Sequence, residues 1–251
     1  MASLVPAALV GVILAAVVAA VGQPLVAVGV LVVVTVALAV WTWRSAPGRV
    51  VRAVGARPSR EEDRPRLHNL VDGLCATMGL PSPAILVVES ARPNAMAVGR
   101  DPRSASLVVT TALDGSLSLV ELEGVLAHEL VHIKRHDTVL SGVAVAVAAP
   151  LSLVMRAGGG ADLVHRLVGH GREFSADQRA ATVVRYPVGL GSALRAMSAP
   201  VDAAGPWPPG RGRTAATTRW LWIDPMVTVG GSAADGALDD PSVRAEALSL
   251  L

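Results

Sequence analysis

The chain has 251 residues, of which 52% are hydrophobic and only 17% are charged, and its formal net charge at pH 7 is +2. This composition is too apolar for an ordinary soluble protein, and the length suits one membrane unit and one globular domain. The 22 basic side chains barely outnumber the 20 acidic ones, so we expect no nucleic-acid partner. The single cysteine, Cys75, cannot form an internal disulfide, which agrees with a reducing compartment.

Residues 1–43 are predicted to form a two-helix transmembrane hairpin. No charged side chain precedes Arg44, and a Gly22-Gln23-Pro24 break separates two apolar stretches, residues 4–21 and 25–43. About 20 apolar residues cross the hydrocarbon core of a bilayer, so each stretch is long enough to span it. A cleaved signal peptide would begin with positive charge, and no Lys or Arg stands before residue 4.

A basic juxtamembrane linker is predicted over residues 44–60. No acid occurs in it before Glu61, whereas it carries five arginines: Arg44, Arg49, Arg52, Arg57 and Arg60. The positive-inside rule places such a segment on the cytoplasmic face, and Trp41 and Trp43 fit the aromatic belt at that interface. We therefore expect a multi-pass protein of the cell membrane, in contact with the lipid bilayer, whose globular domain lies on the cytoplasmic side.

Residues 61–190 are predicted to form an α+β domain. Apolar residues recur with helical spacing from Leu67 to Met78, which places Cys75 in the core. Three short runs rich in β-branched residues, at 84–88, 95–98 and 107–111, are predicted to be strands. Such a small strand layer followed by helices defines the α+β class.

The helix after the strands carries the candidate chemistry. Ser118 and Glu121 have the spacing of a capping box, and the helix is expected to end near Asp137. His128 and His132 lie four residues apart, so both imidazoles face one side and can bind one zinc ion. Glu129 is turned about 100° away, which allows it to touch a metal-bound water and act as a base. Alternatively, the histidines are ordinary exposed residues, unless a third ligand follows.

The candidate third ligands are His136, His165, His170, Glu173 and Asp177. The metzincin pattern is excluded, because Arg135 and Thr138 stand where that class has Gly and His. A second long helix is expected over residues 161–186. It places Glu173 and Asp177 one turn apart on one face.

Two His and one Glu form a known catalytic zinc shell, and a metal-bound His usually donates its other N–H to a carboxylate. We therefore predict one zinc ion per chain, held by His128, His132 and Glu173, with Asp177 supporting a histidine. The alternative for the two carboxylates is an exposed acidic helix face between Arg172 and Arg179.

Four motifs carry a family resemblance: NAMAVGR at 94–100, VTT at 109–111, ELEGVLAHELVHIK at 121–134 and EFSAD at 173–177. Together they are similar to the HtpX-type membrane zinc metallopeptidases, relatives of the CAAX prenyl endopeptidases, over about residues 67 to 186. The resemblance implies a gluzincin-like fold, the zinc ligands named above, and Glu129 as catalytic acid and base. It also implies cytoplasmic proteolysis of membrane or misfolded proteins, with an extended peptide lying on the strand at 94–98.

Two features depart from the family pattern. Residues 191–251 are expected to be a Pro/Gly-rich loop and a C-terminal tail, in which Asp240-Pro241-Ser242-Val243 lacks the histidine of the family's His-Pro-Pro stretch. The family usually places two membrane helices after the histidines, whereas this chain has one apolar run at 138–155. We predict that this run does not cross the membrane, because one crossing would separate Glu173 from the histidines by about 30 Å.

The leading prediction is a membrane-anchored zinc endopeptidase acting on a protein or peptide substrate. An intramembrane-cleaving metalloprotease is a second possibility, but its Leu-Asp-Gly-like motif would have to be Leu113-Asp114-Gly115, which precedes the histidines. A third is a catalytically silent zinc-binding scaffold or sensor. Glu129 argues against it, since a closed structural site has no use for a base. Candidate oxyanion donors are Tyr186, Arg172 and His170, and the oligomeric state is not indicated.

Overall fold

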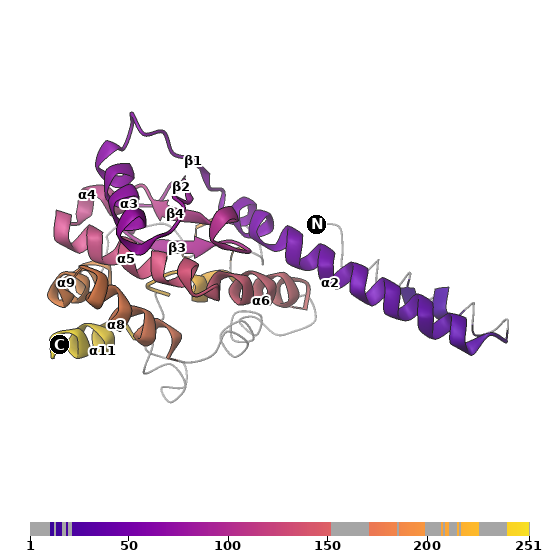
Figure 1. Cartoon of the computed structure of the whole chain (residues 1–251). Helices are drawn as coiled ribbons and strands as arrows, with labels where there is room; N and C mark the ends of the chain where they lie inside the picture. Colours follow the sequence, from indigo (N-terminus) through magenta and orange to yellow (C-terminus); the bar gives the residue numbers. More distant parts are fainter. Residues whose placement is uncertain are drawn as a thin grey trace.

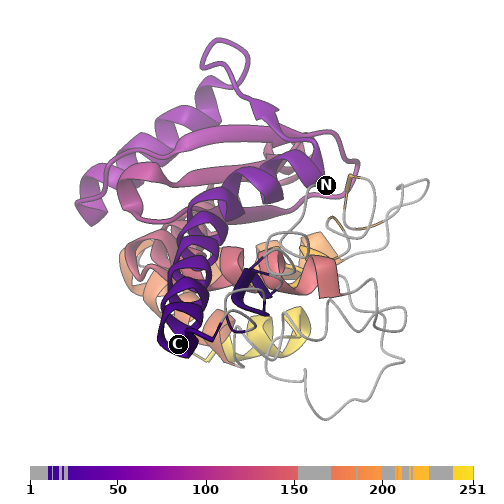
Figure 2. The ribbon, with the colours of Figure 1, turned by 90° about the vertical axis from the view of Figure 1, so that its right-hand side faces the viewer.

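The computed structural model of the 251-residue chain describes residues 11–12, 14–16, 19, 22–151, 171–184, 186–198, 207, 209–210, 215, 217–225 and 240–250. A long helix, α2 (Pro24–Val54), leads away from a domain built of a small sheet and several helices (Figure 1). Seen along α2, the sheet occupies one side of this domain and the C-terminal helices occupy the other (Figure 2).

Helix α2 begins with Pro24 in its first turn and ends at Gly55, whose φ of 74° closes the helix. Within the described part of the chain, it is the helix that is long and apolar enough to cross a membrane. The helix continues beyond residue 43 to Val54, so the predicted linker is helical over most of its length. Val50 and Val54 are buried, which joins the end of α2 firmly to the domain.

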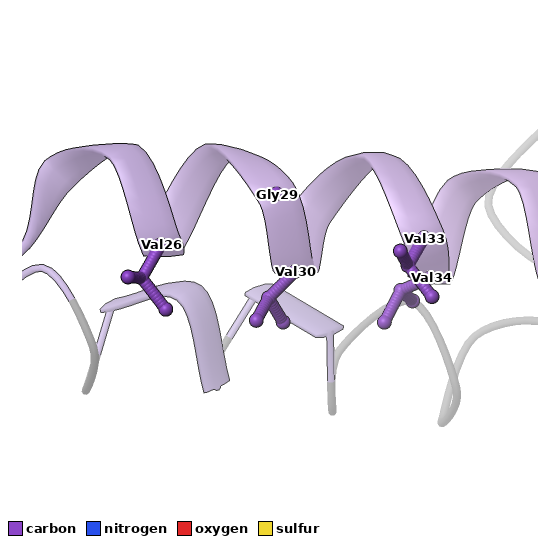
Figure 3. Close-up of a pocket in the computed structure, with 5 residues that line it drawn as sticks. All are labelled: Val26, Gly29, Val30, Val33 and Val34. Carbon is purple, nitrogen blue, oxygen red and sulfur yellow. The ribbon is translucent and has the colours of Figure 1, made fainter.

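The predicted partner helix of the hairpin falls partly outside the described residues, and the hairpin stays a prediction. Gly11 packs closely on α2, because a Cβ atom at this position would lie 2.5 Å from Cγ1 of Val34. An apolar groove lies on the same part of α2, lined by Val26, Gly29, Val30, Val33 and Val34 (Figure 3).

The sheet has four strands in the order β1-β2-β4-β3: β1 (Arg57–Pro58), β2 (Ala84–Val88), β4 (Ser106–Thr110) and β3 (Ala95–Val98). β2 and β4 are parallel, and the other two pairs are antiparallel. The three predicted strands are confirmed to within one residue, while the two-residue β1 was not expected.

Strand β3 lies at one edge of the sheet, as the resemblance implied. The N–H of Thr110 donates to the carbonyl of Asn94 across the β3–β4 pair. Because backbone groups alternate in direction along an antiparallel strand, those of Ala95 point to the outer edge. There the Ala95 carbonyl accepts a hydrogen bond of 3.0 Å from the N–H of Ile223, which belongs to the C-terminal part of the chain.

Helix α3 (Pro65–Met78) ends at Gly79, which has a φ of 67°, and Cys75 is buried in its apolar face. A short 3-10 helix, η1 (Pro102–Ser104), forms the turn between β3 and β4, and α4 (Leu113–Ser116) follows β4. Helix α5 (Leu119–Lys134) then begins with the predicted capping box. It lies between the sheet and the C-terminal helices, and its inward residues share one apolar core with α3 and α9.

Helix α6 (Asp137–Leu151) contains the described part of the apolar run at 138–155. Ala144, Val145 and Ala148 of α6 are buried in the cluster that also contains Val50 and Val54 of α2. The inner face of α6 is therefore covered by protein. The prediction that this run does not cross the membrane stays a prediction.

The C-terminal part of the chain contributes several helices to the domain. The second long helix was predicted over residues 161–186, and the structure has α8 (Arg172–Val184), which begins after Gly171 with its φ of 74°; residues 161–170 lie outside the described residues. The predicted domain boundary at residue 190 falls inside α9 (Pro187–Ser198). Leu194 and Met197 of α9 are fully buried, and the 3-10 helix η2 (Arg219–Leu221) and α11 (Pro241–Leu248) also add residues to the cores. These segments belong to the folded domain because their apolar side chains complete its core.

Candidate metal centre

Helices α5 and α8 bring the three predicted ligands together. His128 and His132 are 0% and 5% exposed, and their Nε2 atoms lie 3.1 Å apart. Glu173 places Oε2 3.0 Å from Nε2 of His128 and Oε1 3.5 Å from Nε2 of His132. Donors on a tetrahedral zinc shell with bonds of about 2.0–2.1 Å lie roughly 3.3 Å from one another. The three side chains therefore fit one zinc ion.

Each histidine has a carboxylate on its other ring nitrogen. Oδ1 of Asp177 lies 2.8 Å from Nδ1 of His128, and Oδ2 of Asp137 lies 3.0 Å from Nδ1 of His132. With the Nδ1 proton of a neutral ring facing each carboxylate, the Nε2 lone pairs would be directed at the common point. The contact of Asp177 agrees with its predicted supporting role. Asp137 was not predicted to contact a histidine, although its position shortly after the H-E-x-x-H motif could have suggested that contact.

The turn between α5 and α6 makes the Asp137 contact. His136 has a φ of 62°, in the left-handed region that few non-glycine residues adopt. Only two residues, Arg135 and His136, separate the end of α5 at Lys134 from the start of α6 at Asp137. As a result, the first side chain of α6 turns back onto His132, one turn earlier in α5. His136, a candidate third ligand, is itself exposed.

An arginine from the C-terminal helix also reaches the centre. Arg244 of α11 is 0% exposed and holds both oxygens of Asp177, with Nε 2.7 Å from Oδ2 and Nη2 2.9 Å from Oδ1. Its Nη1 donates to the carbonyl of Ile223 at 2.7 Å, and its Nη2 lies 3.8 Å from Oε2 of Glu173. Arg244 was not predicted, because nothing in its local sequence pattern links a short terminal helix to the histidines.

Electrostatics keep the carboxylates ionised. Burial opposes the charge of Glu173, but Arg172, with Nη2 2.7 Å from Oε1, holds the pKa of Glu173 well below its usual range. Burial likewise opposes the charge of Asp177, and Arg244 lowers the pKa of Asp177. Ionised carboxylates are the forms that ligate a metal or accept from an imidazole N–H.

Glu129 differs from these carboxylates, because burial raises its pKa while the neighbouring His128 and His132 oppose that shift. Its side chain is 1% exposed. A carboxyl group with a raised pKa suits proton transfer near neutral pH better than an ordinary glutamate does. The arrangement thus contains three candidate ligands and a separate acid–base group, which is the set that H-E-x-x-H metallopeptidases use.

Other candidates lie away from the centre or outside the described residues. Tyr186 is 53% exposed and lies with Val120 around Gly189, at the first turn of α5 and about 12 Å along the helix from His128. Asp114, the possible ligand of an intramembrane protease, lies in α4 with its carboxylate facing Arg64 and Arg66. Residues 165 and 170 are outside the described residues.

Comparisons with known proteins relate the chain to a peptidase family. Residues 61–219 match the family model described as peptidase family M48. A Protease HtpX homolog of Acidiphilium cryptum is 32% identical over 206 residues, which cover 70% of each chain. A Protease HtpX homolog of Salinibacter ruber is 35% identical over 169 residues, 59% of this chain and 61% of the relative. One from Tropheryma whipplei is 37% identical over 170 residues, 56% and 58% of the two chains.

The chain therefore belongs to peptidase family M48, as a member of its HtpX type. The matched part spans about three fifths of the length of the Salinibacter ruber relative. The family match ends at residue 219, before Ile223 and α11, although Arg244 of that helix contacts the centre.

Proposed function

We propose that the protein is a membrane-anchored zinc endopeptidase, in which His128, His132 and Glu173 hold one zinc ion per chain. The observation that carries the proposal is the convergence of their three donor atoms within 4.8 Å of one another. Their separations suit a zinc shell that leaves a fourth position for water. Zinc bound there would polarise a substrate carbonyl and lower the pKa of a water molecule.

The protein's own groups would divide the remaining work. Asp177 and Asp137 fix the ring orientation of the two histidines, since each faces an Nδ1 atom. Glu129 accepts a proton from the attacking water and returns it to the leaving amine, a role that its raised pKa supports. Arg172 keeps Glu173 ionised as a ligand.

A peptide substrate would bind as an extended segment along β3, because edge strands recognise peptides through backbone hydrogen bonds. Ala95 directs its backbone groups to this edge, where Ile223 bonds its carbonyl. The segment around Ile223 would have to shift for a substrate to reach Ala95. Membrane and misfolded proteins are the proposed substrate class, cleaved on the cytoplasmic side of the cell membrane.

Zinc content and peptidase activity of the purified full-length protein test the proposal together. We expect about one zinc per chain and hydrolysis of an unfolded protein such as casein, lost with a chelator and restored by zinc. Zinc without hydrolysis would favour the scaffold or sensor. The absence of both would contradict the metal site itself.

A further inference from the structure

The last described helix, α11, docks tightly on the domain. Its first turn is capped by Asp240, whose Oδ1 accepts a 2.8 Å hydrogen bond from the N–H of Ser242. Gly191 of α9 lets α11 approach closely, because a Cβ atom there would lie 3.2 Å from the carbonyl of Ala245. Ala245 and Leu248 are buried in the main core. Arg244 lies on the same inward face of α11, so its positively charged side chain is fully buried in the domain.

The guanidinium of Arg244 is matched to its surroundings. Two of its nitrogens bind the two oxygens of Asp177, and the third donates to the Ile223 carbonyl. A planar fork with fixed donors suits this two-point grip on a carboxylate, and a lysine could not reproduce it. A buried charge is costly unless paired, so the contacts hold Arg244 and Asp177 to each other.

Asp177 links Arg244 to His128, one of the proposed zinc ligands. Its Oδ1 lies 2.9 Å from Nη2 of Arg244 and 2.8 Å from Nδ1 of His128. Rotation of the carboxylate would break its bonds to the guanidinium, so Arg244 fixes the direction from which Asp177 meets the imidazole. The orientation of the His128 ring, and hence of its Nε2 atom, depends on that direction.

We propose that Arg244 is a positioning residue of the metal centre, which orients His128 through Asp177 and makes the C-terminal helix α11 part of the zinc site. This inference rests on the proposed zinc site. It assigns a role to a segment that lies beyond the part matched by the family model and lacks the histidine of the family's C-terminal motif.

Zinc affinity of the full-length protein in detergent, measured by competition with a chromogenic chelator, tests the proposal without using catalysis. Arg244→Gln removes the fork and should weaken zinc binding about 10- to 100-fold, the range for partners that orient metal ligands. Arg244→Lys keeps a positive charge but loses the two-point grip, and should also weaken binding. The lysine variant still tests the proposal if the glutamine variant does not fold.

Leu248→Ala is the matched control, because it removes a buried apolar contact of the same helix without touching Asp177. Its zinc affinity should stay within about threefold of the wild type, since no ligand partner is changed. If Leu248→Ala weakens zinc binding as much as Arg244→Gln does, Arg244 acts only by docking α11, and the proposal is overturned.

A double-mutant cycle tests the route through Asp177. In an Asp177→Asn background, Arg244→Gln should add less than about threefold to the loss, because the carboxylate that it orients is already gone. An undiminished effect in that background overturns the proposed route. If the wild-type protein binds no zinc, both the proposed function and this inference are contradicted. If the wild type binds zinc and both Arg244 variants bind it equally tightly, only this inference is contradicted.

Discussion

Oδ1 of Asp177 in α8 lies 2.8 Å from Nδ1 of His128 in α5, so a carboxylate from one helix supports a candidate metal ligand on another. Asp137 stands in the same relation to His132, at 3.0 Å, but comes from the first turn of α6. The two imidazoles are thus each contacted by a carboxylate from a different helix that follows α5 in the chain. Such oriented rings are prepared for a metal before it binds, which lowers the cost of ordering them.

Glu129→Gln should keep zinc and lose activity. The side chain neighbours the ligands without contributing to the His-His-Glu group, whereas proton transfer requires its carboxylate. General acid–base groups contribute about 10²- to 10⁴-fold, so casein hydrolysis should fall by at least about 10²-fold. Glu123→Gln, on the same helix, is the control and should hydrolyse casein like the wild type. An empty zinc site in Glu129→Gln, or turnover near that of the wild type, would contradict the assigned role.

Glu173→Ala and Asp177→Ala should differ in their effect on zinc. Loss of a ligand should strip most of the metal, whereas loss of an orienting carboxylate should weaken affinity about 10- to 100-fold. Metal analysis after dialysis against a weak chelator would rank the two variants. If Asp177→Ala loses zinc and Glu173→Ala retains it, the two carboxylates have the opposite roles.

Asp137→Ala should weaken zinc binding about 10-fold or more, because the His132 ring loses the partner on its Nδ1 atom. Asp72→Ala is a suitable control, since Asp72 is exposed on α3 and bonds Ser82. Chelator competition would report both affinities. Equal affinities for the two variants would mean that the contact between Asp137 and His132 does not orient the ligand.

Zinc binding should release a proton from His128. Burial alone would lower the pKa of this imidazole, but Asp177 and Glu173 outweigh burial and raise it to about 9. Since zinc binds the neutral ring, its affinity should rise about tenfold per pH unit from neutral pH, and the rise should end near pH 9. Calorimetric titrations with zinc in two buffers of different ionisation enthalpy would count the proton. An affinity independent of pH over this range would contradict the protonated apo state.

The same shift sets the pH dependence of stability in the zinc-free protein. The folded-state pKa of His128 lies above its unfolded value of about 6.5. Its protonation therefore stabilises the fold fully below about pH 6.5, and this contribution is lost as the pH rises towards about 9. Urea unfolding with a chelator present should show that loss, and His128→Gln should reduce it.

The apolar run at 138–155 should not cross the membrane. Single cysteines at positions 60, 156 and 162, in a Cys75→Ser background, should all be protected from an impermeant thiol reagent in intact cells. They should become reactive when the cytoplasmic face is opened. Labelling of position 162 from outside, with position 60 protected, would contradict both this topology and Glu173 as a ligand, because one crossing spans about 30 Å.

The sequence by itself determined the local features of this protein. The spacing of His128 and His132 on one helix face, the capping box at Ser118 and the three predicted strands all follow from short-range periodicity and backbone chemistry. The approach of Glu173 and Asp177 to the histidines was also predictable, because a zinc site with two histidines requires a third ligand and few candidates exist.

Only the tertiary structure decided how separate elements meet. The contact of Asp137 with His132 depends on the left-handed turn at His136, and the contact of Arg244 with Asp177 joins residues 67 positions apart. The extension of α2 to Val54 and the inclusion of α9 in the core likewise depend on docking against other elements. Side-chain periodicity specifies which face of a helix is buried, but the partner that covers it is set by the packing of the whole domain.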